Sequence, residues 1–270
     1  MLKYDKSEKL RNFPHVYYVN LDNRTDRREY MEKQFEFWRL DFTRISSSKY
    51  AASKAKEWGP NKVSGVIKDM PAYVVGNAVT HLDFMKEWLN NSTDPWLLLM
   101  EDDYDLNLIR YWNFNWDYLM NRIPYDWDCL QIGYESTKFI PFFLHPKLNH
   151  TYFGPVILQR DYVEKILDLH SDGDKWNFEK VLGDKKFNKS AGTVDYFIGH
   201  TGRTYCIPLI TTNDTLTSGE NGVMINRIHH KHSRRAYYHW WMTQHKKFSL
   251  DDFFTYGKVN DHKMIISTIK

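Results

Sequence analysis

The sequence predicts an α/β architecture, and three observations support this fold class. Short apolar runs alternate along the chain with segments whose apolar residues recur at helical spacing. Hydrophobic residues make up 42% of the 270 residues, which is enough for a sizeable core. No repeat, low-complexity tract or clear linker interrupts the pattern. We therefore expect a main domain over residues 1–222 and a helical, basic and aromatic extension over residues 223–270 that packs on it.

The first part of the chain is expected to supply two strands and two helices. The run HVYYVNL, residues 15–21, indicates a buried strand, and residues 25–38 follow as a helix with apolar residues at helical spacing. Residues 41–46 predict a second, short strand. Residues 49–68 are expected to be irregular with some helix. A strong helix is predicted over residues 75–90, because its valine, leucine, methionine and tryptophan residues share one face.

The second part of the chain keeps the same alternation. The apolar run WLLLM leads directly into three acids and indicates a buried strand. Turn signals between residues 138 and 158 indicate a hairpin-like return. The expected elements are a strand over 96–103, a helix over 108–122, a strand over 128–134, a helix over 162–169, a short helix from Thr193 and a strand over 204–211.

Charge and cysteine content exclude several classes of protein. The formal net charge is +3, whereas a dedicated nucleic-acid binder is usually far more basic, so we expect no nucleic-acid partner. Cys129 and Cys206 are too few for a disulfide scaffold or a four-cysteine zinc site. No apolar signal core begins the sequence, and no stretch approaches the roughly 20 apolar residues of a membrane span. The expected location is therefore the cytoplasm.

Three adjacent acids follow the predicted strand at residues 96–103. Glu101, Asp102 and Asp103 repel one another unless a cation or water relieves the repulsion. Mg²⁺ and Mn²⁺ prefer carboxylate oxygen and bridge to phosphate, and ligands of open α/β sheets lie at the carboxyl ends of strands. The three acids are thus candidate metal ligands. A solvated acidic turn is the alternative.

Two further segments carry unusual polar residues. Arg24, Arg27 and Arg28 lie in the strand-to-helix turn NLDNRTDRR, where guanidinium groups and helix N–H groups favour phosphate. Asn20 of the same turn could contact a base or a ribose, although a plain helix start with solvated arginines is the alternative. His81 stands inside the apolar pattern of the next helix. A lone helical histidine is more often a hydrogen-bonded packing residue than a ligand.

In this order the segments resemble glycosyltransferase family 25, which includes lipopolysaccharide-type and collagen galactosyltransferases. A V-G-C-x-x-S-H-like helix start is similar to VGNAVTH, and an apolar strand ending in E-D-D is similar to WLLLMEDD. A P-V-D-like turn resembles TVD, which ends at Asp195. Asn77 and Thr80 replace the usual Cys and Ser of the family. The family's opening N-L-D/x-R-x-x-R-R-like segment is matched by Asn20, Leu21, Arg24, Arg27 and Arg28.

The resemblance implies a GT-A-like fold, in which a twisted mixed sheet with a Rossmann-like nucleotide-binding half is flanked by helices. It also implies an inverting transfer of a hexose from a UDP-sugar, often UDP-galactose, to a hydroxyl group of a glycan or glycoconjugate. The acidic triplet would take the part of the family's metal-binding D-x-D motif. On this basis, Asn20, Leu21 and the three arginines are expected to contact the nucleotide-sugar, together with His81.

A mechanism follows from the same residues. Asp103, with Glu101, is expected to hold Mn²⁺ or Mg²⁺ against the donor diphosphate, while Asp102 holds the ribose or the sugar. The acceptor hydroxyl needs a base, for which Asp195 is the candidate. The alternative for Asp195 is a helix N-cap without a catalytic part.

Two other classes of protein remain possible from the sequence. A metal-dependent phosphodiesterase or nucleotidyltransferase would use the same acids on phosphorus, but it normally needs a second acidic pair or a His-Asp set that the sequence does not clearly offer. A non-catalytic protein that binds nucleotide-sugars or glycans is the second class. The intact acidic triplet argues weakly against it.

The basic and aromatic segment 227–247 is expected to lie outside the catalytic sheet. Its composition suits an anionic glycan, an anionic membrane surface or a lipid-linked acceptor, which co-sedimentation with anionic vesicles at low salt would test. The alternative is a C-terminal helix packed by Tyr237, Trp240 and Trp241. A histidine of this segment could also complete the metal shell from the far side, and the candidates are His229, His230 and His232.

Overall fold

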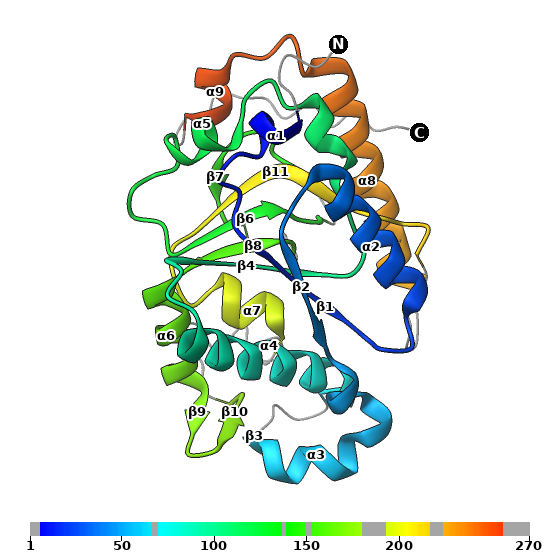
Figure 1. Ribbon diagram of the computed structural model, residues 1–270, viewed down its shortest axis with the longest axis vertical. Coiled ribbons are helices and arrows are strands. Elements are labelled where there is room, and N and C mark those ends of the chain that lie inside the picture. The colour runs from blue at the N-terminus through cyan, green and yellow to red at the C-terminus, as the bar shows by residue number, and fades with distance from the viewer. Residues whose placement is uncertain are drawn as a thin grey trace.

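The computed structural model describes residues 6–65, 70–136, 139–148, 153–179, 193–216 and 224–255. Figure 1 shows a mixed sheet at the centre with helices above and below it. The strands of this sheet are β1 (Val16–Asn20), β2 (Phe42–Ser46), β4 (Trp96–Glu101), β5 (Tyr104–Asp105), β6 (Cys129–Gly133), β7 (His145–Pro146), β8 (Val156–Gln159) and β11 (Thr204–Thr212). They lie in the order β2-β1-β4-β8-β6-β11-β5, and β7 also pairs with β11.

Helices cover both faces of the sheet, and a small second sheet lies at the end of the molecule below α4 (Figure 1). The α-helices are α1 (Lys6–Lys9), α2 (Thr25–Trp38), α3 (Ala55–Lys62), α4 (Ala72–Asn91), α5 (Trp116–Met120), α6 (Arg160–His170), α7 (Val194–Gly199), α8 (Met224–Gln244) and α9 (Leu250–Phe254). The small sheet consists of β3 (Val63–Gly65), β9 (Ser171–Asp172) and β10 (Lys175–Asn177).

The half of the sheet formed by β2, β1 and β4 is Rossmann-like. β1 is parallel to both neighbours, and α2 and α4 form the connections. Side chains of β4 alternate between the faces. Leu98 and Met100 pack in the core that includes α2, whereas Leu97 and Leu99 pack against α4. The unbroken apolar run of this strand is thus explained by burial on both faces.

The other half makes the sheet mixed. β8 runs antiparallel between β4 and β6, while β6 and β11 are parallel. β5 and β7 pair with β11 in the antiparallel sense. The architecture expected from the sequence is therefore confirmed: a mixed sheet with a Rossmann-like half, flanked by helices.

Two sequence-based expectations about local structure were wrong. The helix predicted over 108–122 is a 3-10 helix, Leu106–Tyr111, followed by the short α5. The side chains of Asp105 and Asn115 accept backbone N–H groups from Asn107 and Tyr118, so each starts a separate short helix. The hairpin predicted between residues 138 and 158 is also absent from the described part of that segment, because β7 pairs with β11 and β8 pairs with β4 and β6.

Helix α8 packs along the sheet on the same side as α2 (Figure 1). Tyr237 and Trp241 are fully buried, and the Trp241 indole N–H donates to the Pro208 carbonyl oxygen at 2.8 Å. The ring of Trp240 stacks on Phe142. These aromatic residues therefore pack the helix onto the domain. Among the residues that the structure describes, no helix has the length and apolar character needed to cross a bilayer.

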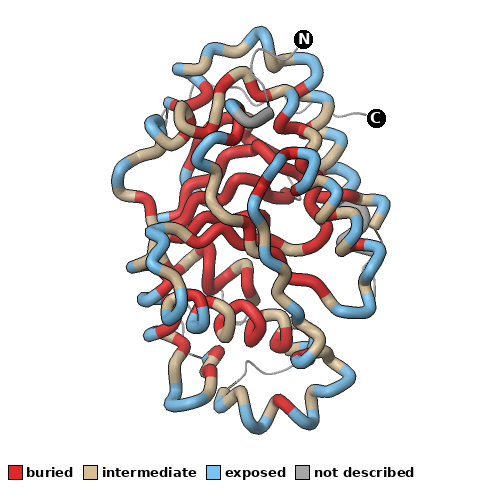
Figure 2. The backbone as a smooth tube through the Cα atoms, viewed as in Figure 1, coloured by how far each residue is buried: buried red, intermediate tan, exposed pale blue. Residues whose placement is uncertain are grey.

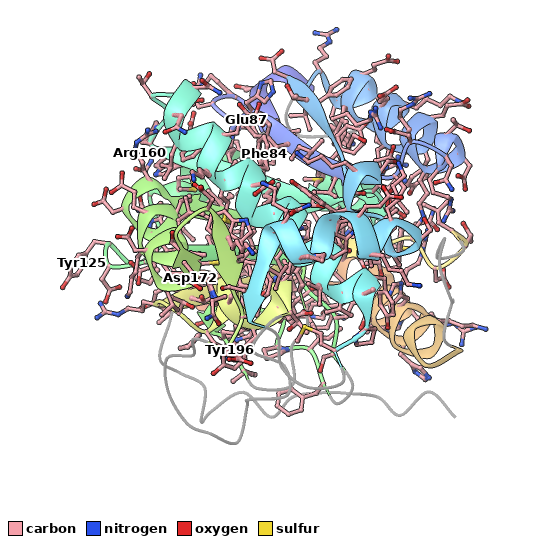
Figure 3. The ribbon with its side chains drawn as sticks, turned by 90° about the horizontal axis from the view of Figure 1, so that it is seen from below. Phe84, Glu87, Tyr125, Arg160, Asp172 and Tyr196 are labelled. Atoms are coloured by element: carbon pink, nitrogen blue, oxygen red, sulfur yellow. The ribbon has the colours of Figure 1, made fainter. Side chains whose placement is uncertain are left out.

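Burial follows the layers of the molecule. Figure 2 shows buried residues along the central strands and on the inner sides of the flanking helices. Below the sheet, Arg160 joins α6 to α4 (Figure 3), because its guanidinium donates to the Leu89 carbonyl oxygen at 2.7 Å and lies over the Trp88 ring. Arg160 thereby links the two helices that cover this face of the sheet.

Candidate functional site

The carboxyl ends of four strands meet at one edge of the sheet. β1, β4, β6 and β11 run in the same direction, since β8 is antiparallel to both β4 and β6. Asn20 and Glu101 end β1 and β4. Glu135 lies just beyond β6, and Thr212 ends β11. Ligands of open α/β sheets bind at such an edge, so these residues define the candidate site.

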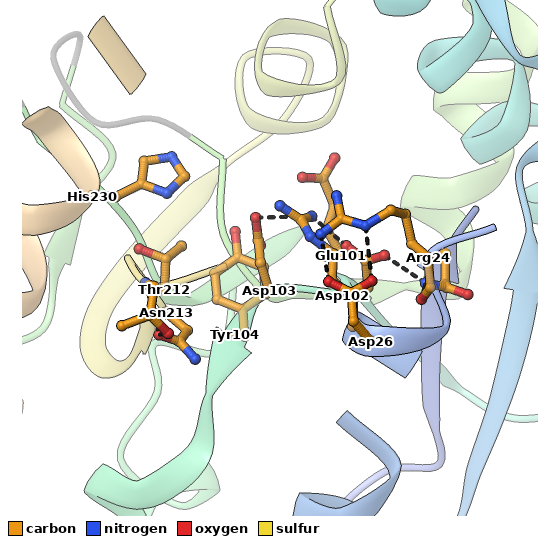
Figure 4. Close-up of polar contacts among 12 residues, drawn as sticks. Arg24, Asp26, Glu101, Asp102, Asp103, Tyr104, Thr212, Asn213 and His230 are labelled. Atoms are coloured by element: carbon orange, nitrogen blue, oxygen red, sulfur yellow. Dashed lines mark hydrogen bonds and ion pairs between the residues drawn. The ribbon is translucent and has the colours of Figure 1, made fainter. Parts of the chain in front are cut away.

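Asp102 is held on both sides by polar partners (Figure 4). The Asn20 amide donates to Oδ2 at 2.7 Å, and the Arg27 guanidinium donates to Oδ1 at 2.6 Å. Arg27 also lies 3.4 Å from the Asp103 carboxylate. All four side chains are buried, and the single guanidinium charge lies between two carboxylates. The turn after β1 and the end of β4 therefore form one charged network.

Glu101 is the carboxyl group of the triplet that Arg27 does not contact. The Asn77 amide of α4 donates to its Oε1 at 2.8 Å. Burial raises the pKa of Glu101 to about 8, and repulsion by Asp103, Asp102 and Asp195 adds to this shift, which the Asn77 hydrogen bond only partly offsets. A bound cation would favour the charged carboxylate. A divalent ion at this corner stays a prediction.

Glu135 is a second carboxyl group with a raised pKa. Its Oε1 accepts a hydrogen bond from the Thr212 hydroxyl at 2.6 Å, and His230 Nε2 of α8 lies 3.3 Å from its Oε2. Burial raises the pKa of Glu135 to about 8, helped by repulsion from Asp103, Asp195 and Glu101. Acids from three elements thus influence one another at this edge of the sheet.

Asp195 lies at the start of α7, within electrostatic reach of both glutamates. Its carboxylate accepts the backbone N–H of Phe153, the residue that precedes the turn into β8. Burial raises the pKa of Asp195, whereas the charge of Lys147 lowers it. The helix cap is Thr193, whose hydroxyl accepts the Tyr196 N–H. The interpretation of Asp195 as the N-cap is therefore wrong.

The other arginines of the first turn have different surroundings. Arg24 forms two hydrogen bonds with Asp26, at 2.9 and 2.8 Å, and its backbone occupies the N-cap position of α2. Arg28 is partly exposed, and its charge acts on Tyr18. Leu21 is also partly exposed. Of the three arginines, only Arg27 reaches the acidic triplet in the described structure.

His81 is completely buried behind the site. Its Nδ1 lies 2.9 Å from the Asn77 carbonyl oxygen, which can only accept, so Nδ1 carries the proton. Its Nε2 has no hydrogen-bond partner among the described residues, and its ring meets Phe153 edge-on. Burial lowers the pKa of His81 to about 4, so the ring is neutral at pH 7. This placement favours a packing role for His81 over contact with a ligand.

The start of α4 shows why a glycine stands beside Asn77. A Cβ on Gly76 would lie 2.1 Å from the Tyr50 carbonyl oxygen, so a larger residue would push the helix away. Gly76 thus allows the close approach that places the Asn77 amide on Glu101. The segment VGNAVTH, which resembles the family motif, therefore lies where α4 packs tightly against the backbone of Tyr50.

The carboxyl groups of the site are the candidate ligands of a metal ion. In the described ranges, no three His, Cys, Asp or Glu side chains converge in a way that could hold one. Mg²⁺ commonly takes only one or two carboxylates and completes its shell with water and substrate phosphates. Glu101 and Asp103 fit that smaller requirement, so they remain the predicted ligands. Of the histidines suggested to complete a metal shell, His230 contacts Glu135, His232 is exposed, and His229 lies where side chains are not described.

Sequence reasoning missed several residues of this edge. Glu135 follows the predicted strand at 128–134 by one residue, so the rule that ligands lie at strand ends could have found it. Nothing in the local pattern marks Asn77, or Arg44, which donates to Asp22 at 2.7 Å and to Asn20 at 3.3 Å. Their partners lie 22 to 24 residues away in the chain.

Fold and site together define an α/β protein with an acidic strand end at the carboxyl edge of a mixed sheet. No family model and no curated protein matches the chain. Among solved structures, it is similar to the "Crystal Structure of A197 from STIV", with a TM-score of 0.39 and 12% sequence identity over 74% of this chain and 84% of that chain.

Proposed function

We propose that this protein is a metal-dependent glycosyltransferase that moves a hexose, galactose or glucose, from a UDP-sugar to a hydroxyl group of a glycan or glycoconjugate. The observation that carries the proposal is the network at the end of β4. Asp102 and Asp103 lie beside the buried guanidinium of Arg27, Asn20 donates to Asp102, and Glu101 adjoins them in sequence and is held by Asn77. Carboxylates and a guanidinium at the carboxyl edge of a sheet suit a diphosphate and its counter-ion.

Each residue of the network has a role in this proposal. Mn²⁺ or Mg²⁺, held by Asp103 with Glu101, would neutralise the charge that develops on the leaving diphosphate. Both oxygens of Asp102 already have partners, so this residue orients Asn20 and Arg27 and contacts the ribose or sugar through its remaining lone pairs. Arg27 forms ion pairs with both Asp102 and Asp103 and so fixes their relative positions.

The transfer itself needs a proton acceptor. The acceptor hydroxyl oxygen forms a bond to the anomeric carbon while the bond to the diphosphate oxygen breaks, and the electron pair leaves with UDP. Asp195 takes the hydroxyl proton in this proposal. Burial supports that part, because a carboxyl group with a raised pKa is a stronger base than an ordinary one.

Product analysis separates the proposal from its rivals. The protein is incubated with UDP-galactose or UDP-glucose and Mn²⁺, with and without a mixture of simple glycosides, and the nucleotide products are resolved. A glycosyltransferase releases UDP, whereas a phosphodiesterase or nucleotidyltransferase releases UMP and a hexose phosphate. A binding protein leaves both donors intact. Asp103→Asn is expected to abolish UDP release, and Asp168→Asn, on the exposed side of α6, serves as the matched control.

A further inference from the structure

The pair formed by Glu135 and His230 has no part in the donor chemistry described above. Glu135 follows β6, and His230 reaches it from α8, so the pair joins the sheet edge to the C-terminal helix. In Figure 4, His230 and Thr212 lie on one side of Asp103, and Arg24 lies on the other side. The pair is therefore placed beside the donor corner, on the side away from Arg24.

A purely structural role explains this pair poorly. Helix α8 is already fixed by Arg234, which lies 2.8 Å from Asp105, and by Tyr237, whose hydroxyl donates to the Tyr134 carbonyl oxygen at 3.0 Å. A buried carboxyl group near other acids costs free energy, and an uncharged glutamine could make the same contacts more cheaply. The raised pKa of Glu135 reflects that cost. Such costly groups concentrate at functional sites.

The chemistry of the pair fits a hydroxyl group. A hydroxyl both donates and accepts, which matches a carboxyl group beside an imidazole, whichever of the two carries the proton. One protein hydroxyl already uses this carboxylate, since Thr212 donates to Oε1 at 2.6 Å. Oε2 has His230 at 3.3 Å, longer than the roughly 2.7–2.9 Å of a full charge-assisted hydrogen bond. Oε2 therefore retains capacity for a second donor.

We propose that Glu135 and His230 form the acceptor subsite, in which Oε2 of Glu135 receives a hydroxyl group of a carbohydrate acceptor and the imidazole orients it. This inference rests on the proposed transferase function and names the class of its second substrate. Glu135 contacts the acceptor, and His230 acts as a positioning residue. The subsite also gives α8 a functional part, because this helix brings the imidazole to the edge of the sheet.

Ligand-observed NMR tests the subsite without turnover. The probes are methyl β-galactoside, methyl β-glucoside and methyl α-mannoside, titrated onto the full chain with UDP and Mn²⁺ present. We expect at least one glycoside to bind, and we expect Glu135→Gln to weaken it about tenfold or more. His230→Gln is expected to weaken it less, because the carboxylate remains. The matched control is Glu29→Gln, an exposed residue of α2, which should bind as the wild type does.

Several outcomes would overturn the subsite. Binding of no glycoside to the wild type, or equal binding to Glu135→Gln, would do so. A loss of UDP affinity in Glu135→Gln would assign the pair to the donor side instead. If Glu135→Gln lowered the unfolding midpoint but left glycoside binding unchanged, the pair would only join α8 to the sheet. The proposed function has a separate readout in UDP release, so glycoside binding without UDP release would contradict the transferase and not the subsite.

Discussion

At the scale of single residues, the variant Asp195→Asn tests whether Asp195 is the general base of the proposed transfer. Asparagine in its place keeps an oxygen that can accept the Phe153 N–H, so the fold should survive the change. The proton acceptor is lost, however. We expect Asp195→Asn to lower kcat roughly 10²–10⁴-fold while donor affinity stays within a few-fold, because a base acts mainly in the transition state.

Steady-state UDP release with a glycoside acceptor, alongside calorimetric UDP binding, measures both quantities for this variant. Asp168→Asn makes the same chemical change at an exposed position and should leave both unchanged. Turnover of Asp195→Asn close to that of the wild type would place the base elsewhere. A large loss of UDP affinity would instead assign Asp195 to the donor site.

The sequence located some site residues because a local rule applies to them. Three acids after an apolar run lie at a strand end whatever surrounds them, and Glu101, Asp102 and Asp103 are found there. Their partners follow no such rule. The hydrogen bond from Arg27 to Asp102 joins residues 75 positions apart, and nothing in the turn sequence distinguishes Arg27 from Arg24. Only the path of the chain after β1 decides which arginine faces inward.

At the scale of elements, α8 depends on one buried tryptophan. Trp241 packs against Phe114, Phe248 and Phe253, and its indole N–H is satisfied by Pro208. We expect Trp241→Ala to lower the free energy of unfolding by about 3–5 kcal/mol, through the cavity and the unpaired carbonyl group that it leaves. Urea denaturation followed by circular dichroism measures the change.

The neighbouring Met242 provides the control for this helix. Its side chain is 55% exposed, so Met242→Ala should change the free energy of unfolding by less than about 0.5 kcal/mol. Equal stability of the Trp241→Ala variant and the wild type would show that the aromatic cluster does not hold α8 on the domain.

Elements with a continuous pattern could be predicted, whereas those decided by long-range pairing could not. The period of α2 and the apolar run of β4 reflect burial that any α/β packing would require. β8 has an equally apolar sequence, yet its place between β4 and β6 is set by pairing with strands at distant positions. The helix predicted over 108–122 was wrong because the capping side chains of Asp105 and Asn115 begin two separate short helices in place of one long helix.

At the scale of the whole molecule, α8 presents two different sides. Its inner side is aromatic and buried, while Lys231 and Arg235 are exposed. The packing that was expected for Tyr237, Trp240 and Trp241 accounts for the inner side. Contact of the outer side with an anionic membrane or a lipid-linked acceptor stays a prediction, as does the cytoplasmic location.

In the proposed function, the acids of the site make metal binding, and with it nucleotide binding, depend on pH. A divalent ion binds ionised carboxylates, and burial together with neighbouring acids raises the pKa of Glu101 to about 8. Protons therefore compete with the ion below that pH. Metal-assisted nucleotide binding should strengthen as the pH rises from about 6 to about 8, because the ionised fraction of Glu101 increases over this range.

Calorimetric titration of UDP in the presence of Mn²⁺, compared with the same titration in a chelator, is the most direct test of the donor site. In the wild type, Mn²⁺ should increase the affinity for UDP about tenfold or more, and Asp103→Asn should lose that increase while keeping the wild-type unfolding midpoint within a few degrees. Asp168→Asn should behave as the wild type. Equal UDP affinity with and without Mn²⁺ in the wild type would contradict a metal-dependent glycosyltransferase.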